Sequence, residues 1–268
     1  MSYKGETLAK KWARQVVWTM LNEGFSDENE RHPVLVLASE VGGDVPVARS
    51  FGVDDRRLLA VDQRTAALAR FSEAYPNVET FRGTMLAALK RTPRIAGAHL
   101  DYCGNLSKSV VYDVALALRR LRGNGIIAVN LLRGREHRSR IRIGGTTKPV
   151  GEWMRLLKAE RPELKPYQVR LMVVMYALKT QGVSPWSLAV YEYQSGVSPM
   201  TTFVLRQDPR CFIRHNKTFF YANQPAHEDA DWKRAMLDSE FGNADTFAVD
   251  RRTWAAWKAH RTMGTYDG

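Results

Sequence analysis

Residues 34–62 of the chain read VLVLASEVGGDVPVARSFGVDDRRLLAVD, and this stretch decides the fold. The apolar run 34–37 predicts a buried strand, and a turn that holds Glu40, Gly42 and Gly43 follows it. A short helix then leads to a second apolar run, which ends on Asp62. The order of strand, glycine turn, helix, strand and acid is typical of the start of a nucleotide-binding α/β domain.

The glycine turn and the acid each have a chemical role in this prediction. Glycine lets the backbone bend sharply and approach a ligand, because a side chain there would collide with it. A carboxylate at the end of the second strand can accept hydrogen bonds from both hydroxyl groups of a ribose. We therefore expect Glu40, Gly42, Gly43 and Asp62 to bind a nucleotide cofactor.

Strands and helices continue to alternate after Asp62, which predicts a Rossmann-like α/β fold with a mostly parallel sheet flanked by helices. The ligand crevice of such a sheet lies beyond the carboxyl ends of its strands, where Glu40, Asp62, Arg82 and Asp101 fall. The expected helices are 65–74, 85–90 and 110–121, the last ended by residues 123–125, and the expected strands are 77–81, 95–100 and 126–132.

The later sequence predicts a basic loop, two helices and a terminal antiparallel hairpin. Residues 133–148 carry no apolar period, and helices are expected over 150–160 and 167–180. The strands 186–193 and 200–206 are joined by a link too short for a crossover helix, so they must be antiparallel. We divide the chain into an N-terminal helix and connector (1–32), a Rossmann-like domain (33–206) and a small basic C-terminal extension (207–268).

Charge and cysteine content limit the class of protein. The net charge of +12 favours a polyanionic partner such as nucleic acid, although solubility alone is the alternative explanation. The two cysteines provide no disulfide framework, which favours a reducing cytoplasm, and no apolar run predicts a membrane span. The segment 119–142 has one acid, Glu136, against many arginines: Arg119, Arg120, Arg122, Arg133, Arg135, Arg138, Arg140 and Arg142.

The five alternating units and the terminal hairpin, over roughly residues 33–206, resemble the class I S-adenosylmethionine-dependent methyltransferases. In that family the turn after the first strand is an acid-x-Gly-x-Gly-x-Gly pattern. Glu40 and Gly42 match its acid and first glycine, while Asp44 and Pro46 stand at the later glycine positions. A nicotinamide enzyme is the rival with the same first half, but its parallel sheet usually continues where this chain has a hairpin.

The resemblance implies S-adenosylmethionine as the cofactor and assigns roles to particular residues. Asp62 matches the acid that binds the ribose, and the Gly83-Thr84 turn lies near the adenine. Asp101 and Tyr102 match the motif beside the transferred methyl group, so Asp101 would accept an amine N–H and Tyr102 would stack on a base. Alternatively, Asp101 caps the next helix or contacts the cofactor amine. Cys103 could be a nucleophile, but a lone cysteine is usually structural.

Two basic segments are expected to contact nucleic acid. The first is the loop with Arg133, Arg135, Arg138, Arg140 and Arg142, which follows the fifth strand at the crevice edge. The second is the C-terminal segment with Arg251, Arg252 and Lys258, which resembles a recognition helix, although its tryptophans could instead pack on the core. The sequence thus predicts a methyltransferase that acts on DNA or RNA, without a metal; the alternative is a non-catalytic nucleic-acid-binding protein on the same scaffold.

Overall fold

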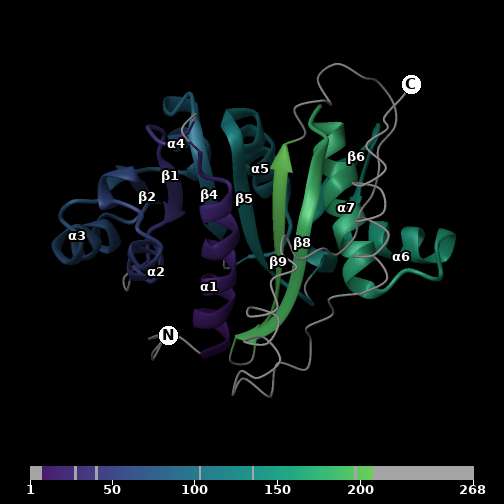
Figure 1. Ribbon diagram of the computed structural model, residues 1–268. Helices are drawn as coiled ribbons and strands as arrows, with labels where there is room; N and C mark the ends of the chain where they lie inside the picture. The colour runs from purple at the N-terminus through teal and green to yellow at the C-terminus, as the bar shows by residue number, and fades with distance from the viewer. Residues whose placement is uncertain are drawn as a thin grey trace, which may run out of the picture.

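The computed structural model describes residues 8–26, 29–39, 42–102, 104–134, 136–195 and 198–207. Its centre is a seven-stranded sheet in the order β3-β2-β1-β4-β5-β9-β8 (Figure 1). The strands are β1 (Val34–Leu37), β2 (Leu58–Asp62), β3 (Glu79–Arg82), β4 (Ile95–Asp101), β5 (Leu121–Leu132), β8 (Pro185–Ser195) and β9 (Ser198–Gln207). Strands β1 to β5 are parallel, whereas β9 is antiparallel to both of its neighbours. The predicted parallel sheet and terminal hairpin are therefore confirmed.

Helices cover both faces of this sheet. One face is covered by α1 (Leu8–Glu23), α2 (Asp44–Ser50) and α3 (Thr65–Ala74). The other is covered by α4 (Met85–Arg91), α5 (Lys108–Arg120), α6 (Val150–Glu160) and α7 (Pro166–Thr180). Two short 3-10 helices, η1 (Asp55–Arg57) and η2 (Glu136–Arg138), lie in the connections. Among the described helices, none is long and apolar enough to cross a membrane.

The continuous apolar runs of the central strands follow from burial on both faces. Successive side chains of a strand point to opposite sides, so Leu35 of β1 packs with α4 and α5, while Val34 and Val36 pack with α1 and α2. Helix α7 contributes Met172 and Met175, which are 7% and 3% exposed, to the core beside α5. The methionine-rich face of α7 is thus a packing surface.

The expected start of the fifth strand was wrong. Strand β5 begins at Leu121, directly after α5, and includes residues 123–125, which we had expected to form a turn before it. A Cβ atom on Gly125 would lie 2.5 Å from the carbonyl oxygen of Ala96, so this glycine permits close approach to β4. The strand register shifts between Ile95 and Gly97 opposite this segment. Gly123 and Gly125 therefore lie inside an irregular part of β5 and do not mark its start.

The expectation of a basic loop over residues 133–148 was also wrong for most of that segment. Residues 133–148 include η2, β6 (Arg140–Ile143) and the start of β7 (Thr146–Pro149), and the two strands pair as an antiparallel hairpin. Ile141 is 1% exposed and anchors the hairpin in the core, while Gly144 takes the positive φ of +58° that its turn requires. The alternation of arginine and isoleucine before two glycines is the sequence signal for this hairpin.

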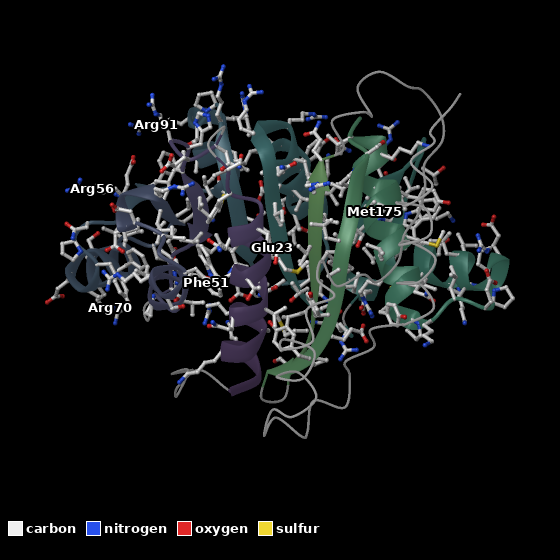
Figure 2. All side chains as sticks on the ribbon, viewed as in Figure 1. Glu23, Phe51, Arg56, Arg70, Arg91 and Met175 are labelled. Carbon is white, nitrogen blue, oxygen red and sulfur yellow. The ribbon has the colours of Figure 1, made fainter. Side chains whose placement is uncertain are left out.

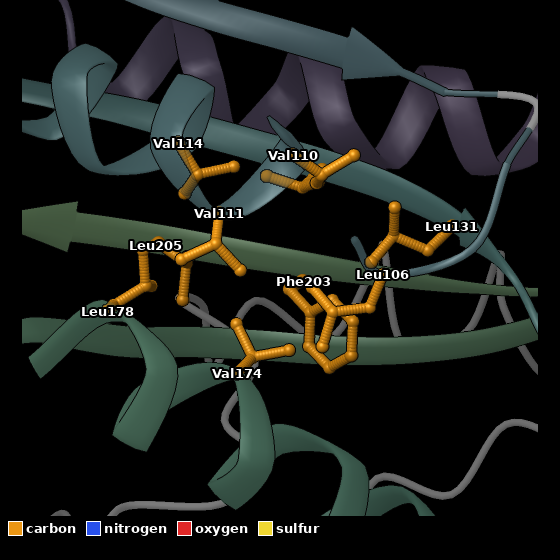
Figure 3. Close-up of a pocket in the computed structure, with 10 residues that line it drawn as sticks. Leu106, Val110, Val111, Val114, Leu131, Val174, Leu178, Phe203 and Leu205 are labelled. Carbon is orange, nitrogen blue, oxygen red and sulfur yellow. The ribbon is translucent and has the colours of Figure 1, made fainter. Parts of the chain in front are cut away.

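A small apolar cavity of about 10 Å³ lies between α5, α7 and the sheet (Figure 3). Val174 lines it, so Val174→Ile, which adds one methylene, is expected to raise the free energy of unfolding by up to about 0.8 kcal/mol. Val173 on the same helix is fully buried but does not line the cavity. The matched variant Val173→Ile should therefore lower the free energy of unfolding by about 1–3 kcal/mol. Urea denaturation measures both, and an equal loss for the two variants would contradict this account of the packing.

Candidate active site

Asp62 lies at the carboxyl end of β2, next to Arg82 of β3 in the strand register. Its carboxylate is 12% exposed and accepts hydrogen bonds from Arg64, at 2.8 Å from the backbone amide and 2.8 Å from Nη2. Burial raises the pKa of Asp62, but the hydrogen bonds from Arg64 outweigh it and hold the pKa below its ordinary value. Asp62 is therefore an ionised acceptor at the predicted edge of the sheet.

The turn between β1 and α2 contains Gly42 and Gly43, which the sequence predicted to admit a ligand close to the backbone. Gly42 has a φ of +54°, a left-handed conformation that favours glycine. The space that side chains would take is filled by other residues, because a Cβ on Gly42 would lie 2.2 Å from the Tyr75 ring and one on Gly43 would lie 2.6 Å from Arg14. The glycines thus admit close packing of α1 and Tyr75 against the turn. Glu40 lies outside the described residues.

The turn after β3 lies beside Asp62. The Gly83 amide donates a hydrogen bond of 3.0 Å to the Asp62 carbonyl oxygen. Thr84 is the N-cap of α4, where its hydroxyl accepts from the Ala87 amide at 3.1 Å. Gly83 and Thr84 therefore adjoin Asp62, and the Thr84 hydroxyl already has a structural partner.

Asp101 ends β4 and is held by ion pairs to α1. Its Oδ2 atom lies 2.9 Å from Lys10 Nζ and 3.7 Å from Arg14 Nη2, and Asn130 Nδ2 donates to Oδ1 at 3.2 Å. Burial raises the pKa of Asp101, but the ammonium of Lys10 above all, with Arg14, holds it below its ordinary value. Asp101 is thus an ionised carboxylate in a fixed orientation. It does not cap α5, because Ser107 is the N-cap of that helix.

A buried polar network continues from Asp101 to Asp44, the first residue of α2. The Oδ1 atom of Asp44 accepts from Trp18 Nε1 at 2.7 Å and from His99 Nδ1 at 2.6 Å, and it lies 3.3 Å from Arg14 Nε. Burial raises the pKa of Asp44, but the contacts with His99 and Arg14 outweigh it and hold the pKa well below its ordinary value. The two carboxylates of the network therefore balance the two cations of α1.

The same network fixes the tautomer of His99. The Asn130 amide nitrogen lies 3.2 Å from the Asp101 carboxylate and 3.1 Å from His99 Nε2, so it donates to both. His99 Nε2 is then an acceptor, and the ring carries its proton on Nδ1, which donates to Asp44. His99 is fully buried, and its role in this structure is to join β4 to α2.

Asp44 and Pro46, which stand at glycine positions of the family pattern, fit their places in α2. Asp44 is 4% exposed and its side chain contacts α1 and β4, so its charge is compensated inside the protein. Pro46 lies in the first turn of the helix, where backbone amides have no partner within the helix. Neither residue disturbs the turn that precedes α2.

Tyr102 points to the opposite face of the sheet from the Asp101 side chain. Its hydroxyl donates to Asp113 of α5 at 2.6 Å, and burial, with the adjacent Asp113, raises its pKa. The structure therefore does not place the Asp101 and Tyr102 side chains where both could contact the same substrate base. Cys103 lies outside the described residues.

The predicted nucleic-acid contacts fall into separate groups. Arg133 is 20% exposed and pairs with Glu192 at 2.9 Å, while Arg138, Arg140 and Arg142 are exposed on η2 and β6. Four further predicted contacts lie outside the described residues, namely Arg135, Arg251, Arg252 and Lys258.

Sequence reasoning missed Lys10, Arg14, His99 and Asn130 as members of the site. Lys10 and Arg14 are four residues apart, and Arg14 is four residues before the buried Trp18, so all three share one face of α1. That spacing was the available signal for Arg14. The partners of His99 and Asn130 come from other elements, and no local pattern identifies them.

Five parallel strands followed by an antiparallel terminal hairpin, with helices on both faces, form the fold of the class I S-adenosylmethionine-dependent methyltransferases. The reversal of strand order between β1 and β4 is the switch point of this sheet, and Asp62, Asp101 and the glycine turn surround it. The candidate active site therefore lies where α/β folds of this kind bind their ligands.

Similar folds are found among solved structures. TrmN from Thermus thermophilus is 14% identical with a TM-score of 0.46, over 77% of this chain and 51% of that one, so this chain spans about half of its length. A TehB-like S-adenosylmethionine-dependent methyltransferase from Corynebacterium glutamicum is 11% identical with a TM-score of 0.41, over 72% and 88%. The fibrillarin pre-rRNA processing protein of Methanococcus jannaschii is 11% identical with a TM-score of 0.36, over 67% of each chain. No protein-family model and no curated protein matches the sequence.

Proposed function

We propose that this chain is an S-adenosylmethionine-dependent methyltransferase that acts on nucleic acid. The observation that carries the proposal is the convergence of Asp62, the Gly42–Gly43 turn and Asp101 around the switch point between β1 and β4. A ligand at that point would meet the backbone of the Gly42–Gly43 turn, an ionised acceptor at the end of β2 and a second ionised acceptor at the end of β4.

The residues around the switch point fit the polar groups of the cofactor. Asp62 has a carboxylate that can accept hydrogen bonds from both ribose hydroxyls while Arg64 continues to hold it from one side. Gly83 and Thr84 adjoin Asp62, where an adenine attached to that ribose would lie. Glu40, Gly42 and Gly43 complete the proposed cofactor site. When bound, S-adenosylmethionine supplies a methyl group on a sulfonium, which is transferred by direct displacement.

Asp101 is proposed to orient the substrate for that displacement. Methyl transfer to an amine requires alignment and a neutral lone pair more than strong acid or base catalysis. The Asp101 carboxylate can accept an N–H bond of an exocyclic amine, and Lys10 and Asn130 hold it in one orientation before the substrate binds. Lys10 and Asn130 are therefore positioning residues, because they act through Asp101.

The proposal of a nucleic-acid substrate rests on charge. The net charge of +12 and the exposed Arg138, Arg140 and Arg142 suit a phosphate backbone, since guanidinium groups bind phosphate oxygens in pairs. Arg133 already has a carboxylate partner in Glu192, so it is a weaker candidate for this contact than the three exposed arginines. Tyr102, whose hydroxyl is bonded to Asp113, would have to leave that bond to stack on a base.

Titration calorimetry of the full chain with S-adenosylmethionine tests the proposal of a cofactor site. We expect saturable heat at one site per chain, and no comparable heat from a nicotinamide dinucleotide, which is the cofactor of the rival enzyme class. A nicotinamide dinucleotide that binds while S-adenosylmethionine does not would replace the proposal with its rival. Heat from neither ligand would favour a non-catalytic nucleic-acid-binding protein.

A further inference from the structure

A groove of about 480 Å³ separates α5 from the β6–β7 hairpin, on the face of the sheet opposite α1. Lys108 and Tyr112 of α5 form one wall of this basic groove, Arg140 and Arg142 of β6 form the other, and Thr180 at the end of α7 closes it. Helix α5 follows β4 in the chain, so Lys108 at its start is joined to Asp101 by the connection 102–107.

The short-range contacts of the cations in the basic groove are with backbone and ring atoms. Arg140 Nη2 donates to the Thr147 carbonyl oxygen at 3.3 Å, Arg142 Nε donates to that of Gly144 at 3.2 Å, and Lys108 Nζ lies 5.7 Å from the Tyr112 ring centroid. Within the described part of the chain, none of the three forms a salt bridge with a carboxylate. Their charge is thus available to an anionic ligand.

The cations of the basic groove differ in this respect from Arg133 and Arg170, which are less exposed. Arg133 and Arg170 both pair with Glu192, and Arg170 also pairs with Glu136. Those guanidinium groups are less than a quarter exposed and have compensating carboxylates. In the basic groove, by contrast, Lys108, Arg140 and Arg142 have no carboxylate at salt-bridge distance among the described residues, and Glu152 interacts with Arg140 only at longer range.

Tyr112 gives the basic groove a second chemical property. Tyr112 is 41% exposed and lines the groove. An exposed aromatic ring beside cations is the combination that binds single-stranded nucleic acid, because unpaired bases stack on the ring while phosphates meet the cations. A duplex keeps its base faces stacked inside the helix, so it cannot use Tyr112 in this way.

We propose that the basic groove binds single-stranded DNA or RNA, with phosphates at Lys108, Arg140 and Arg142 and one base stacked on Tyr112. This inference rests on the proposed function in one respect: it identifies the substrate of the methyltransferase as a strand, or a looped-out region, with unpaired bases.

The test is fluorescence anisotropy of labelled short oligonucleotides, single-stranded and duplex, over a salt series. The triple variant Lys108→Ala, Arg140→Ala, Arg142→Ala should weaken single-strand binding at least tenfold at low salt and should lower the slope of log affinity against log salt by about 2, at roughly 0.7 per lost phosphate contact. Tyr112→Ala should weaken single-strand binding about 5-fold to 150-fold and leave duplex binding within twofold.

A matched control removes the same charge elsewhere. Arg56, Arg70 and Arg91 are exposed and lie toward the β2–β3 side of the sheet, away from Met175 of α7 (Figure 2). Their triple replacement by alanine should change affinity less than threefold. An equal loss in the two triple variants, or a wild-type preference for duplex, would overturn the inference.

Cofactor titration separates this inference from the proposed function. The triple groove variant is expected to give the wild-type heat with S-adenosylmethionine, because none of its substitutions lies at the switch point. If the wild type binds single strands through the groove but gives no heat with the cofactor, the groove proposal stands and the methyltransferase proposal fails. If the cofactor binds but Tyr112→Ala has no effect on single-strand binding, the proposal of a cofactor site stands and the groove proposal fails.

Discussion

Replacing Asp62 with alanine is expected to weaken S-adenosylmethionine binding about 10-fold to 150-fold. The variant removes the carboxylate at the end of β2 that would accept the ribose hydroxyls, and hydrogen bonds to a charged group contribute about 1.5–3 kcal/mol. The fold should survive, because the pair with Arg64 is a surface interaction in which the Arg64 side chain is 63% exposed. Titration calorimetry measures the loss of affinity, and urea denaturation checks that the protein stays folded.

Glu79→Ala is the matched control for the Asp62 variant. Glu79 is an exposed acid at the start of β3, at the opposite end of that strand from Arg82 and the switch point. Its replacement removes the same charge but should leave the cofactor affinity within twofold. Equal affinities for wild type, Asp62→Ala and Glu79→Ala would show that the carboxylate of Asp62 does not contact the ligand.

Asp44→Ala is expected to lower the free energy of unfolding by about 3–5 kcal/mol, the usual cost of breaking a buried ion pair. The variant leaves the 5% exposed Arg14 without its nearer carboxylate and removes the acceptor of Trp18 Nε1 and His99 Nδ1. Chemical denaturation followed by tryptophan fluorescence measures the change. Asp54→Ala is the control, because Asp54 is an exposed acid that accepts a hydrogen bond from the Arg56 amide. This variant should lower the free energy of unfolding by only about 0.5–2 kcal/mol.

The contribution of Asp44 should also depend on pH with a defined sign. Its folded-state pKa lies below the ordinary value of 3.8, so the folded state binds the proton less readily than the unfolded state. The stabilisation is therefore complete above about pH 5 and is lost as the pH falls below 4. The stability difference between wild type and Asp44→Ala should shrink in acid; a difference that stays constant down to pH 3 would contradict the proposed ion pairing.

The sequence predicted the sheet well because its signals are local. The apolar runs that became β1, β2 and β4 are buried on both faces. Because these strands are parallel neighbours, the residues at their carboxyl ends, among them Asp62 and Asp101, lie at one edge of the sheet. The hairpin of β8 and β9 followed from the shortness of its link. The β6–β7 hairpin was not predicted, because β6 is only four residues long and its apolar alternation consists of Ile141 and Ile143 alone.

The site was predictable only in part, since its polar network joins residues far apart in the sequence. Asp62 and Asp101 could be located from the strand ends, but the contacts of Arg14 with Asp44 and Asp101 span α1, α2 and β4. Interactions of this kind leave no periodic pattern in any one element. The glycine turn shows the same limit, because Tyr75 and Arg14, which occupy the space beside Gly42 and Gly43, lie in other elements.

Transfer of a labelled methyl group tests the central proposal most directly. The full chain would be incubated with tritium-labelled S-adenosylmethionine and with single-stranded and duplex DNA and RNA, and the nucleosides would then be separated. We predict label in a modified base, mainly from single strands, and loss of that label in Asp62→Ala. Binding of both the cofactor and the nucleic acid without any labelled nucleoside would contradict the proposed methyltransferase activity.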